Sequence, residues 1–332
     1  MRGRRDAEAA GPSIRDEHAP AVRWLTIDEG HAGQRLDNYL IGLLKGVPKT
    51  HVYRVIRAGE VRVNKGRAGA DTRLAIGDVV RVPPVRLPER PAVTPAPARE
   101  FPVLLEDEHV LAIAKPAGVA VHGGSGVSFG VIEQLRQARP QARFLELVHR
   151  LDRDTSGVLL LAKRRSALTH LQAQFRERGT DKRYDALVIG RWNPKQRVID
   201  APLQRYLTAE GERRVREDAE GARAITLVHV AQAFERFTLL DVTIRTGRTH
   251  QIRVHLAQAG CAIVGDDKYG DFGLNKALAA GRLPGLHGAP LPRFGRMFLH
   301  ARELAFDHPA DGRRVALSAA LPGECATLLA AL

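Results

Sequence analysis

Residues 149–157, with the sequence HRLDRDTSG, combine two carboxylates with three basic side chains and lead directly into an apolar segment, residues 158–162. Such a turn before a buried strand can hold one carboxylate at the edge of a cleft, with cations around it and no set of metal ligands nearby. An acid held in this way can act as a nucleophile. The alternative is a solvated turn before a core strand, because Asp and Ser favour turns in general.

A second stretch with suggestive chemistry is residues 181–188, in which Tyr184 follows a basic pair and opens an alternating strand that leads to Gly190. A tyrosine at the start of a strand offers an aromatic ring and a hydroxyl group. The same residue can equally be a packed aromatic side chain, and this stretch alone does not decide between the two.

A third stretch, residues 245–256, predicts a short helix that carries polar side chains. Thr249 can cap this helix, and Gly260 can end it. His250 and Arg253 are three residues apart and therefore share one helical face. The helix would deliver Arg253 on a rigid element, although an arginine on a helix is otherwise usually a solvated surface residue.

The composition limits the partners on which these residues could act. The chain has 332 residues and 44% apolar side chains, enough for one large domain and a smaller one. Its 51 Lys and Arg residues against 37 Asp and Glu residues give a net charge of +14. Such a charge favours polyanionic partners, and it leaves RNA, DNA and an anionic membrane open.

Apolar runs and cysteines exclude other classes of protein. The longest apolar runs, residues 158–162 and 326–332, are much shorter than the roughly 20 residues of a membrane-spanning helix. The basic N-terminus has no apolar region behind it and does not resemble a secretion signal. Cys261 and Cys325 are too few for a disulfide framework or a cysteine metal site. We therefore expect a cytoplasmic protein.

The N-terminal part predicts a small domain. Residues 1–24 are polar and aperiodic and predict a flexible tail. Residues 25–83 then predict a compact α/β unit, with an apolar stripe between Leu36 and Leu44 for a first helix. Thr50 can cap a second helix that ends at Gly59. Strands are expected at 61–63 and 78–82, around a turn at 64–66.

Basic side chains cluster on the second helix and on the turn that follows the first predicted strand of this unit. Between residues 35 and 82 there are ten Lys or Arg residues and four acids, a balance that suits contacts with phosphate groups. The candidates for RNA contact in this unit are Lys49, Arg54, Arg57, Arg62 and Lys65. These charges could also merely keep a small domain soluble. A proline-rich stretch at 84–100 predicts a semi-rigid linker to a second domain, residues 101–332.

The start of the second domain predicts further strands and a loop. Residues 110–114 predict a buried strand that stops at residues 115–118, and 119–122 predict a resumed strand. A glycine-rich loop follows at 123–126. It lacks the Gly-Lys-Ser/Thr ending of a nucleotide triphosphate site, so we interpret it as a loop near the cleft.

The order of these segments resembles a known family. The N-terminal unit, with RLD at residues 35–37 and GEVRVN at 59–64, resembles the S4 RNA-binding domain. The segments KPAG, HGGSG, HRLDRDTSG, KRY and RTGRTHQIRVHL resemble pseudouridine synthases that act on large-subunit ribosomal RNA, especially the type C branch. The resemblance runs from Arg35 to Pro309. Residues 271–296 form a longer Gly/Pro/Leu-rich stretch than this branch leads us to expect.

The resemblance implies an α+β fold and a reaction. It implies an S4 domain followed by a catalytic domain with a mixed, mainly antiparallel sheet flanked by helices and loops. It identifies Asp152 as the catalytic acid, places Tyr184 against the target base and pairs Arg253 with the acid. Arg150 and His250 are further candidates for RNA contact. The implied reaction converts uridine to pseudouridine in 23S ribosomal RNA or its precursor, without a cofactor or a metal ion, by a monomeric enzyme with no DNA or membrane partner.

Several alternatives remain open at this point. Asp152 could attack C1′ of the ribose or abstract the C2′ proton. The target uridines could lie elsewhere in large-subunit RNA or in transfer RNA, or the protein could bind RNA through its S4 domain without catalysis. A glycoside hydrolase would need a pair of opposed acids, for which only Asp152 and Asp154 are available in an awkward turn.

Overall fold

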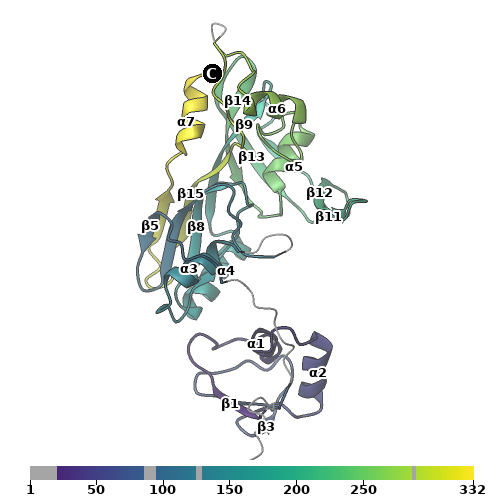
Figure 1. The fold of residues 1–332 in the computed structure, drawn as a ribbon, viewed down its shortest axis with the longest axis vertical. Coiled ribbons are helices and arrows are strands. Elements are labelled where there is room, and N and C mark those ends of the chain that lie inside the picture. The colour runs from purple at the N-terminus through teal and green to yellow at the C-terminus, as the bar shows by residue number, and fades with distance from the viewer. Residues whose placement is uncertain (1–20, 86–94, 125–128, 286–288) are drawn as a thin grey trace, which may run out of the picture. The chain divides into compact units, whose positions relative to one another are not determined.

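The computed structural model describes residues 21–85, 95–124, 129–285 and 289–332. The chain divides into two compact units after residue 93 (Figure 1). Residues 1–20 of the expected tail lie outside the described residues, as do residues 86–94 of the expected linker, 125–126 of the glycine-rich loop and 286–288 of the longer stretch.

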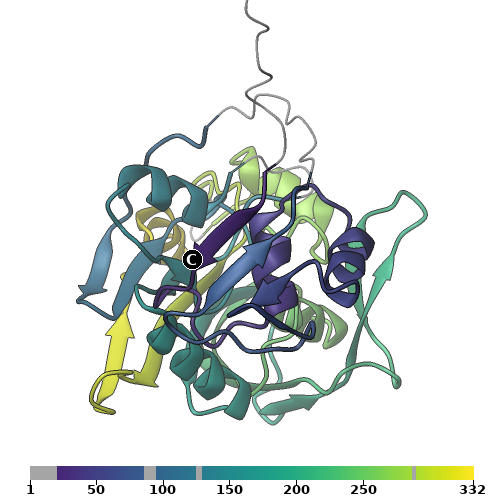
Figure 2. The same ribbon diagram turned by 90° about the horizontal axis from the view of Figure 1, so that it is seen from below.

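The first unit combines two helices with a small antiparallel sheet (Figure 2). Its helices are α1 (Leu36–Leu43) and α2 (Lys49–Arg57), and its strands are β1 (Arg23–Thr26), β2 (Arg62–Val63), β3 (Gly66–Arg67) and β4 (Val79–Val82). The sheet order is β1-β4-β2-β3. One core joins the elements, because the apolar stripe of α1, with Leu36 and Leu40, packs with Val52, Val55 and Val80.

Three details of this unit concern the sequence predictions. The left-handed conformation of Gly59, with φ of 73°, confirms the predicted end of α2. Thr50 was wrong as a cap, because α2 begins at Lys49 after Pro48 and has no side-chain cap. Strand β1 starts at Arg23, inside the stretch expected to be a tail. Three of its four residues are exposed, so its sequence shows no alternation of apolar and polar side chains. Its pairing with β4 is what defines it as a strand.

The second unit contains a ten-stranded mixed sheet, as expected. Its main order is β10-β13-β14-β9-β15-β8-β6-β5, with β16 paired to β15 and β7 paired to β8. The strands are β5 (Val103–Glu106), β6 (Val110–Lys115), β7 (Glu146–Leu147), β8 (Ser156–Ala162), β9 (Asp181–Ile189), β10 (Val198–Asp200), β13 (Ile225–Ala233), β14 (Phe237–Ile244), β15 (Leu299–Asp307) and β16 (Arg314–Ser318). The pair β15–β8 is parallel, and the other pairs of this sheet are antiparallel.

Strand β8 directly follows the turn that contains Asp152, and we call residues 149–155 the catalytic turn after the role expected for this acid. All seven residues of β8 are buried. Leu159 and Leu161 pack into one core cluster, whereas Val158 and Leu160 pack into another on the opposite face. A strand buried on both faces gives a continuous apolar run, which is why the sequence predicted it correctly. The resumed strand expected at 119–122 was wrong, since no strand forms there.

Helices cover the two faces of the sheet. Helix α3 (Val131–Ala138) contributes Leu135 to the first core cluster, and α4 (Arg165–Glu177) contributes Leu171 to the second. Helix α5 (Gln251–Gln258) also packs into the first cluster. Within the part of the chain that the structure describes, none of the helices combines the length and apolar character needed to span a membrane.

Two further features lie at the other end of the sheet. Helix α6 (Phe272–Ala279), in the longer stretch, and helix α7 (Gly323–Ala330) share a core cluster through Leu278 and Leu328. The strands β11 (Leu203–Leu207) and β12 (Arg213–Glu217) form a separate hairpin that stands away from the main sheet (Figure 1).

Candidate active site

The three stretches singled out in the sequence meet at one cavity. Asp152, Tyr184, His250 and Arg253 all line a pocket of about 490 Å³. They come from the turn before β8, from strand β9, and from the start and first turns of helix α5. The structure therefore brings together residues that are separated by up to 101 positions in the chain.

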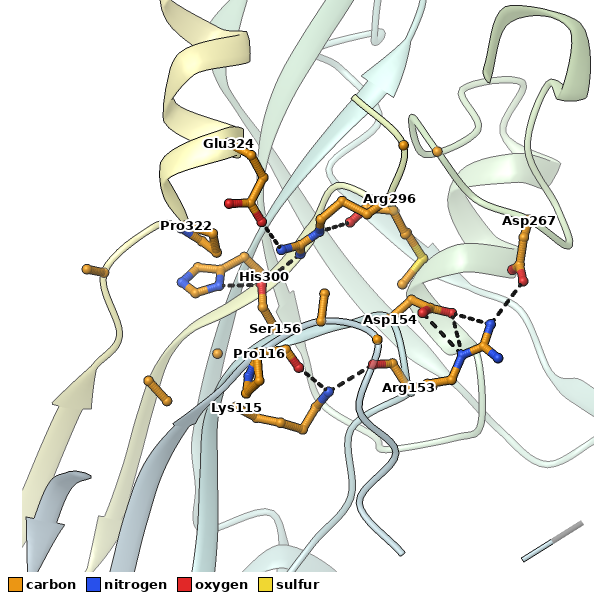
Figure 3. A pocket seen from close by; sticks show the side chains of 18 residues that line it. Lys115, Pro116, Arg153, Asp154, Ser156, Asp267, Arg296, His300, Pro322 and Glu324 are labelled. Atoms are coloured by element: carbon orange, nitrogen blue, oxygen red, sulfur yellow. Dashed lines mark hydrogen bonds and ion pairs between the residues drawn. The ribbon is translucent and has the colours of Figure 1, made fainter. Parts of the chain in front are cut away.

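The turn that carries Asp152 is fixed by backbone contacts at both ends. The buried Lys115 donates hydrogen bonds to the carbonyl oxygens of Pro116 and Arg153, at 2.8 and 2.9 Å (Figure 3), and to that of Val119 at 2.8 Å. Burial lowers the pKa of Lys115 to about 7, against the opposing charges of Asp154 and Asp152. The Lys115 side chain thus joins the turn at Arg153 to the segment 116–119.

Gly157, at the other end of the turn, permits the approach of strand β15. A Cβ atom on Gly157 would lie 2.1 Å from the carbonyl oxygen of Ala301, and its φ of 118° is one that side chains rarely adopt. Any other residue here would push β15 away from β8. The glycine at the end of the HRLDRDTSG stretch is therefore a packing requirement.

Arg253 is buried, with 3% of its side chain exposed, and binds three carboxylates. Its Nε and Nη2 atoms each donate to Asp266 at 2.7 Å, and Nη2 also donates to Asp267 at 3.0 Å. Its Nη1 atom lies 3.5 Å from Asp152. The expected proximity of Arg253 to Asp152 is present, but the main partner of the guanidinium group is Asp266.

This arrangement keeps the guanidinium group charged. Burial opposes the charge, but the hydrogen bonds and charge of Asp266, with Asp152 and Asp267, raise the pKa of Arg253 above its usual value. Burial likewise opposes the charge of Asp266, and Arg253 holds the pKa of that carboxyl below its usual value. Because Asp266 takes the bidentate contact, Asp152 stays only loosely bound and remains 18% exposed to the cavity.

His250 lies between Asp152 and a tyrosine that the sequence interpretation missed. The Tyr269 hydroxyl accepts a hydrogen bond from the backbone N–H of Val215 at 2.9 Å, so its own proton is free for His250 Nδ1 at 2.8 Å. This assignment leaves the ring proton on Nε2, which faces Asp152 at 4.0 Å. Burial, opposed by Asp152 and reinforced by Arg253, lowers the pKa of His250 and favours the neutral ring.

The start of helix α5 corrects one sequence prediction. Thr249 does not cap the helix; His250 occupies the capping position in a left-handed conformation, with φ of 53°. The Thr249 hydroxyl instead accepts a hydrogen bond from Arg205 of strand β11 at 2.6 Å. The end of the helix at Gly260, with φ of 81°, agrees with the prediction.

Tyr184 forms part of the cavity wall on β9. Only 8% of the residue is exposed, and it packs in the core cluster on the cavity side of the sheet. Burial and the charge of Asp152 raise the pKa of its hydroxyl well above the usual value. The group therefore stays protonated, and it can act through its ring and as a hydrogen-bonding hydroxyl.

The charge of the cavity lining is strongly asymmetric. Asp152 is the single carboxylate among the described lining residues. Seven cations line the same cavity: Arg150, Arg176, Arg178, Lys182, Arg245, Arg248 and Arg253. Arg150 is exposed and also lines a neighbouring cavity of about 430 Å³ with Asp152 and His250. Such a lining favours an anionic ligand.

The candidate RNA contacts of the first unit all lie at its surface. The exposed side chains are those of Lys49, Arg54, Arg57, Arg62 and Lys65. Arg57 also lines an open hollow of about 670 Å³ beside Tyr53 and Arg67. These cations are accessible to phosphate groups, but their arrangement does not indicate recognition of a particular base sequence.

A further cavity of about 590 Å³ lies beside the catalytic turn (Figure 3). Asp154 lines it, bound by Arg153 at 3.0 Å, and does not line the cavity of about 490 Å³. Asp154 does share the cavity of about 430 Å³ with Asp152, so the cavities alone do not separate the two acids. In the same cavity, Ser156 Oγ and His300 Nδ1 lie 2.9 Å apart, and His300 Nε2 donates to the carbonyl of Ala319. Nδ1 therefore accepts from the Ser156 hydroxyl, and both ring nitrogens are used in structural hydrogen bonds.

Metal binding has no support in the described ranges. No group of three or more His, Cys, Asp or Glu side chains there is arranged to hold a metal ion.

The sequence interpretation missed two residues of the site, Asp266 and Tyr269. A possible signal was the GDDKYG stretch at 265–270, in which two acids and an aromatic residue closely follow the helix that carries Arg253.

Comparisons with known proteins identify the two units. Residues 109–258 match the family described as RNA pseudouridylate synthase, and residues 34–80 match the S4 domain. The chain is 49% identical over 319 residues to the ribosomal large subunit pseudouridine synthase C of Yersinia pestis, which covers 94% of this chain and 96% of the relative. It is also 49% identical over 306 residues to the protein of the same name from Escherichia coli K12, covering 90% and 93%.

Solved structures show the same catalytic fold. The structure of human RNA pseudouridylate synthase domain containing 4 has a TM-score of 0.52 and 25% identity, and covers 69% of this chain and 92% of its own. Human RNA pseudouridylate synthase domain containing 1 has a TM-score of 0.53 and 25% identity, covering 69% and 87%.

Proposed function

Because this chain belongs to the RNA pseudouridylate synthase family, we propose that it converts specific uridines of 23S ribosomal RNA or its precursor to pseudouridine. The observation that carries the proposal is the cavity itself, in which one carboxylate, Asp152, faces a lining of seven cations. The ribosomal substrate rests on the names of the relatives, which match nearly the whole chain.

Asp152 is the proposed catalytic residue. The N1–C1′ glycosidic bond breaks with its electron pair on the uracil, the uracil rotates within the cavity, and C5 forms a bond to C1′. C5 then loses its proton and N1 gains one. Asp152 starts this sequence as a carboxylate, either by attacking C1′, from which it is displaced when C5 bonds, or by taking the C2′ proton, which it later returns. Arg253 Nη1 lies 3.5 Å from Asp152, and the stronger contact of Arg253 with Asp266 leaves the Asp152 oxygens available.

The other site residues have supporting roles in this proposal. Tyr184 packs against the flipped uracil with its ring, and its protonated hydroxyl can bond to the base. Neutral His250 orients Asp152 through Nε2 and contacts the RNA at the cavity mouth. Arg150, which is exposed at the rim, binds the strand that leaves the cavity.

The rest of the chain supplies affinity for the RNA. A uridine stacked in a helix is out of reach of Asp152, so it must be flipped or already unpaired, at a cost of a few kcal/mol. Phosphate contacts offset this cost. Residues 25–83 act in this proposal as the RNA-binding domain through Lys49, Arg54, Arg57, Arg62 and Lys65, residues 84–100 as a linker, and residues 101–332 as the catalytic domain. The protein would work as a monomer on RNA, without a DNA or membrane partner.

The test uses an unmodified large-subunit ribosomal RNA transcript. The wild-type protein and the Asp152→Ala variant are incubated with the transcript, and pseudouridine is measured by mass spectrometry after chemical labelling. We expect pseudouridine at a few defined positions with the wild type and none with the variant. Equal amounts with both proteins would exclude Asp152 as the catalytic residue, and no pseudouridine with either would favour an RNA-binding protein without catalysis.

A deletion strain tests the substrate. Loss of pseudouridine at defined positions of the large-subunit RNA is the expected result. Loss in transfer RNA alone would overturn the ribosomal assignment and keep the reaction.

A further inference from the structure

Among the described residues, three Lys or Arg residues are buried, namely Lys115, Lys182 and Arg253. They differ in the groups that they contact. Arg253 is bound by carboxylates, and Lys115 donates three hydrogen bonds to carbonyl oxygens. Lys182 has one donated hydrogen bond, to the hydroxyl of Thr180 at 3.1 Å, and among the described residues no carboxylate lies within ion-pair distance. An ammonium group buried without an anion is costly.

The neighbours of Lys182 do not supply this anion. Asp181, the adjacent residue, points to the other side of strand β9 and is bound by Arg314. The ring of Phe175 lies 5.5 Å from the Lys182 ammonium and offers a cation–π contact. Burial lowers the pKa of Lys182; the charge of Asp181 opposes this effect without forming an ion pair, and the like charges of Arg245 and Arg178 add to it.

Lys182 faces the proposed active site. It lies two residues before Tyr184 on the same strand, so both side chains point to the same face, about 7 Å apart along the strand. Both line the cavity of about 490 Å³, as do Arg178 and Arg245, whose side chains are exposed. Phe175 stacks on His149, which begins the catalytic turn, with ring centroids 4.8 Å apart.

We propose that Lys182, together with Arg178 and Arg245, binds a backbone phosphate of the RNA strand next to the uridine that is isomerised. A phosphodiester brings the negative charge that this end of the cavity lacks, and it accompanies any uridine that enters at Tyr184. The identity of the strand rests on the function proposed above. The subsite is separate from Asp152, and Lys182 is a positioning residue.

This phosphate contact fixes the ribose relative to Asp152. Three cations, one on β9 and two directly after the ends of α4 and β14, hold the phosphate, while Tyr184 holds the base, so the sugar between them has little freedom. The loss of the contact therefore affects both the binding of RNA and the placement of C1′.

The first experiment compares Lys182→Met, which removes the charge, with Lys182→Arg, which keeps it. Lys195→Met is the matched control, because Lys195 is exposed, has no ion pair among the described residues and lies outside the cavity. We expect Lys182→Met to weaken RNA binding roughly tenfold at low salt and to reduce the salt dependence by about 0.7 in log–log slope. Lys182→Arg and the control should stay near the wild type.

A second measurement locates the phosphate. In a short RNA around a mapped target uridine, the phosphates on either side are replaced one at a time by neutral methylphosphonate groups. One replacement should reduce the rate of the wild type at subsaturating RNA about tenfold and should have no effect on Lys182→Met. If every replacement affects both proteins equally, the subsite is wrong.

Stability distinguishes a binding role from a structural role. Methionine has a similar length and no charge, so Lys182→Met should melt at the same temperature as the wild type or higher. A lower melting temperature together with unchanged RNA binding would overturn the proposal. If the wild type forms no pseudouridine but Lys182→Met still changes the salt dependence, the proposed reaction fails and the phosphate site stands.

Discussion

The cavity holds two buried cations that are stabilised in opposite ways. Arg253, beside Asp152, is bound by Asp266 through two hydrogen bonds of 2.7 Å, whereas Lys182, two residues before Tyr184, has only neutral partners among the described residues, the Thr180 hydroxyl and the Phe175 ring. The first arrangement is complete within the protein and fixes the geometry of the reacting group. The second is incomplete within the described protein, and the missing charge belongs to the ligand. Of these two cations, the one whose counter-ion is present serves the scaffold, and the other serves binding.

The strongest contrast should come from neutral replacements of the two cations. Arg253→Met leaves Asp266 buried without its partner, and we expect the free energy of unfolding to fall by about 3–5 kcal/mol, whereas Lys182→Met should cause no loss. Denaturant unfolding followed by tryptophan fluorescence measures both. In a Trp24→Phe background the remaining tryptophan, Trp192, is buried in the catalytic unit and reports on that unit alone.

Pseudouridine formation should separate the same variants. Arg253→Met should form none, whereas Lys182→Met should still form pseudouridine at saturating RNA, at a reduced rate because the placement of C1′ is less restricted. An Arg253→Met protein with wild-type stability would contradict the view that Arg253 and Asp266 form one structural unit.

Acid should weaken the Arg253 arrangement. The pKa of Asp266 is lower in the folded protein than its ordinary value of 3.8, so its contribution to stability is complete above that value and is lost as the pH falls through the folded pKa. We expect the difference in unfolding free energy between the wild type and Asp266→Asn to be largest near pH 7 and to shrink below about pH 4. A constant difference from pH 7 to pH 3 would show that the lost contact is not ionic.

Tyr269→Phe tests how His250 is oriented. The substitution removes the hydroxyl that accepts from Val215 and donates to His250, while the ring that lies 5.3 Å from the Arg253 guanidinium group remains. We expect kcat to fall about tenfold, in line with about 1–2 kcal/mol for the lost hydrogen bonds, with little change in RNA affinity. The His250 titration by NMR should shift at the same time, and an unchanged titration would exclude the link.

The smallest effect should come from Asp267→Asn. Asp267 contacts Arg253 at 3.0 Å, but half of its side chain is exposed and Asp266 retains the main contact. We expect a loss of at most about 1 kcal/mol in unfolding free energy. A loss as large as that of Asp266→Asn would mean that the two carboxylates act together.

The sequence was enough to predict the features that depend on neighbours close in the chain. The run at 158–162 predicted a strand buried on both faces, and the three motifs named Asp152, Tyr184 and Arg253, which the structure places at one cavity. The apolar stripe of α1 and the glycine that ends α2 followed from periodicity and backbone freedom.

Other features depend on partners that are distant in the chain. Asp266 and Tyr269 lie in an aperiodic loop, and their roles arise only when α5 and the hairpin β11–β12 pack against them. Strand β1 exists through its pairing with β4. The absence of an anion near Lys182 is likewise a tertiary property, since the sequence places Asp181 directly beside it.

The close approach at Gly157 also affects the order of events during synthesis on the ribosome. Strand β15 lies between β9 and β8 in the sheet, and its parallel pairing joins His300 to Ser156, 144 positions apart. The turn with Asp152 is therefore exposed on one side until the chain has been made at least as far as β15. A nascent chain released before that point would carry the acid without the neighbours that orient it, so productive chemistry on RNA should begin only after translation has passed β15.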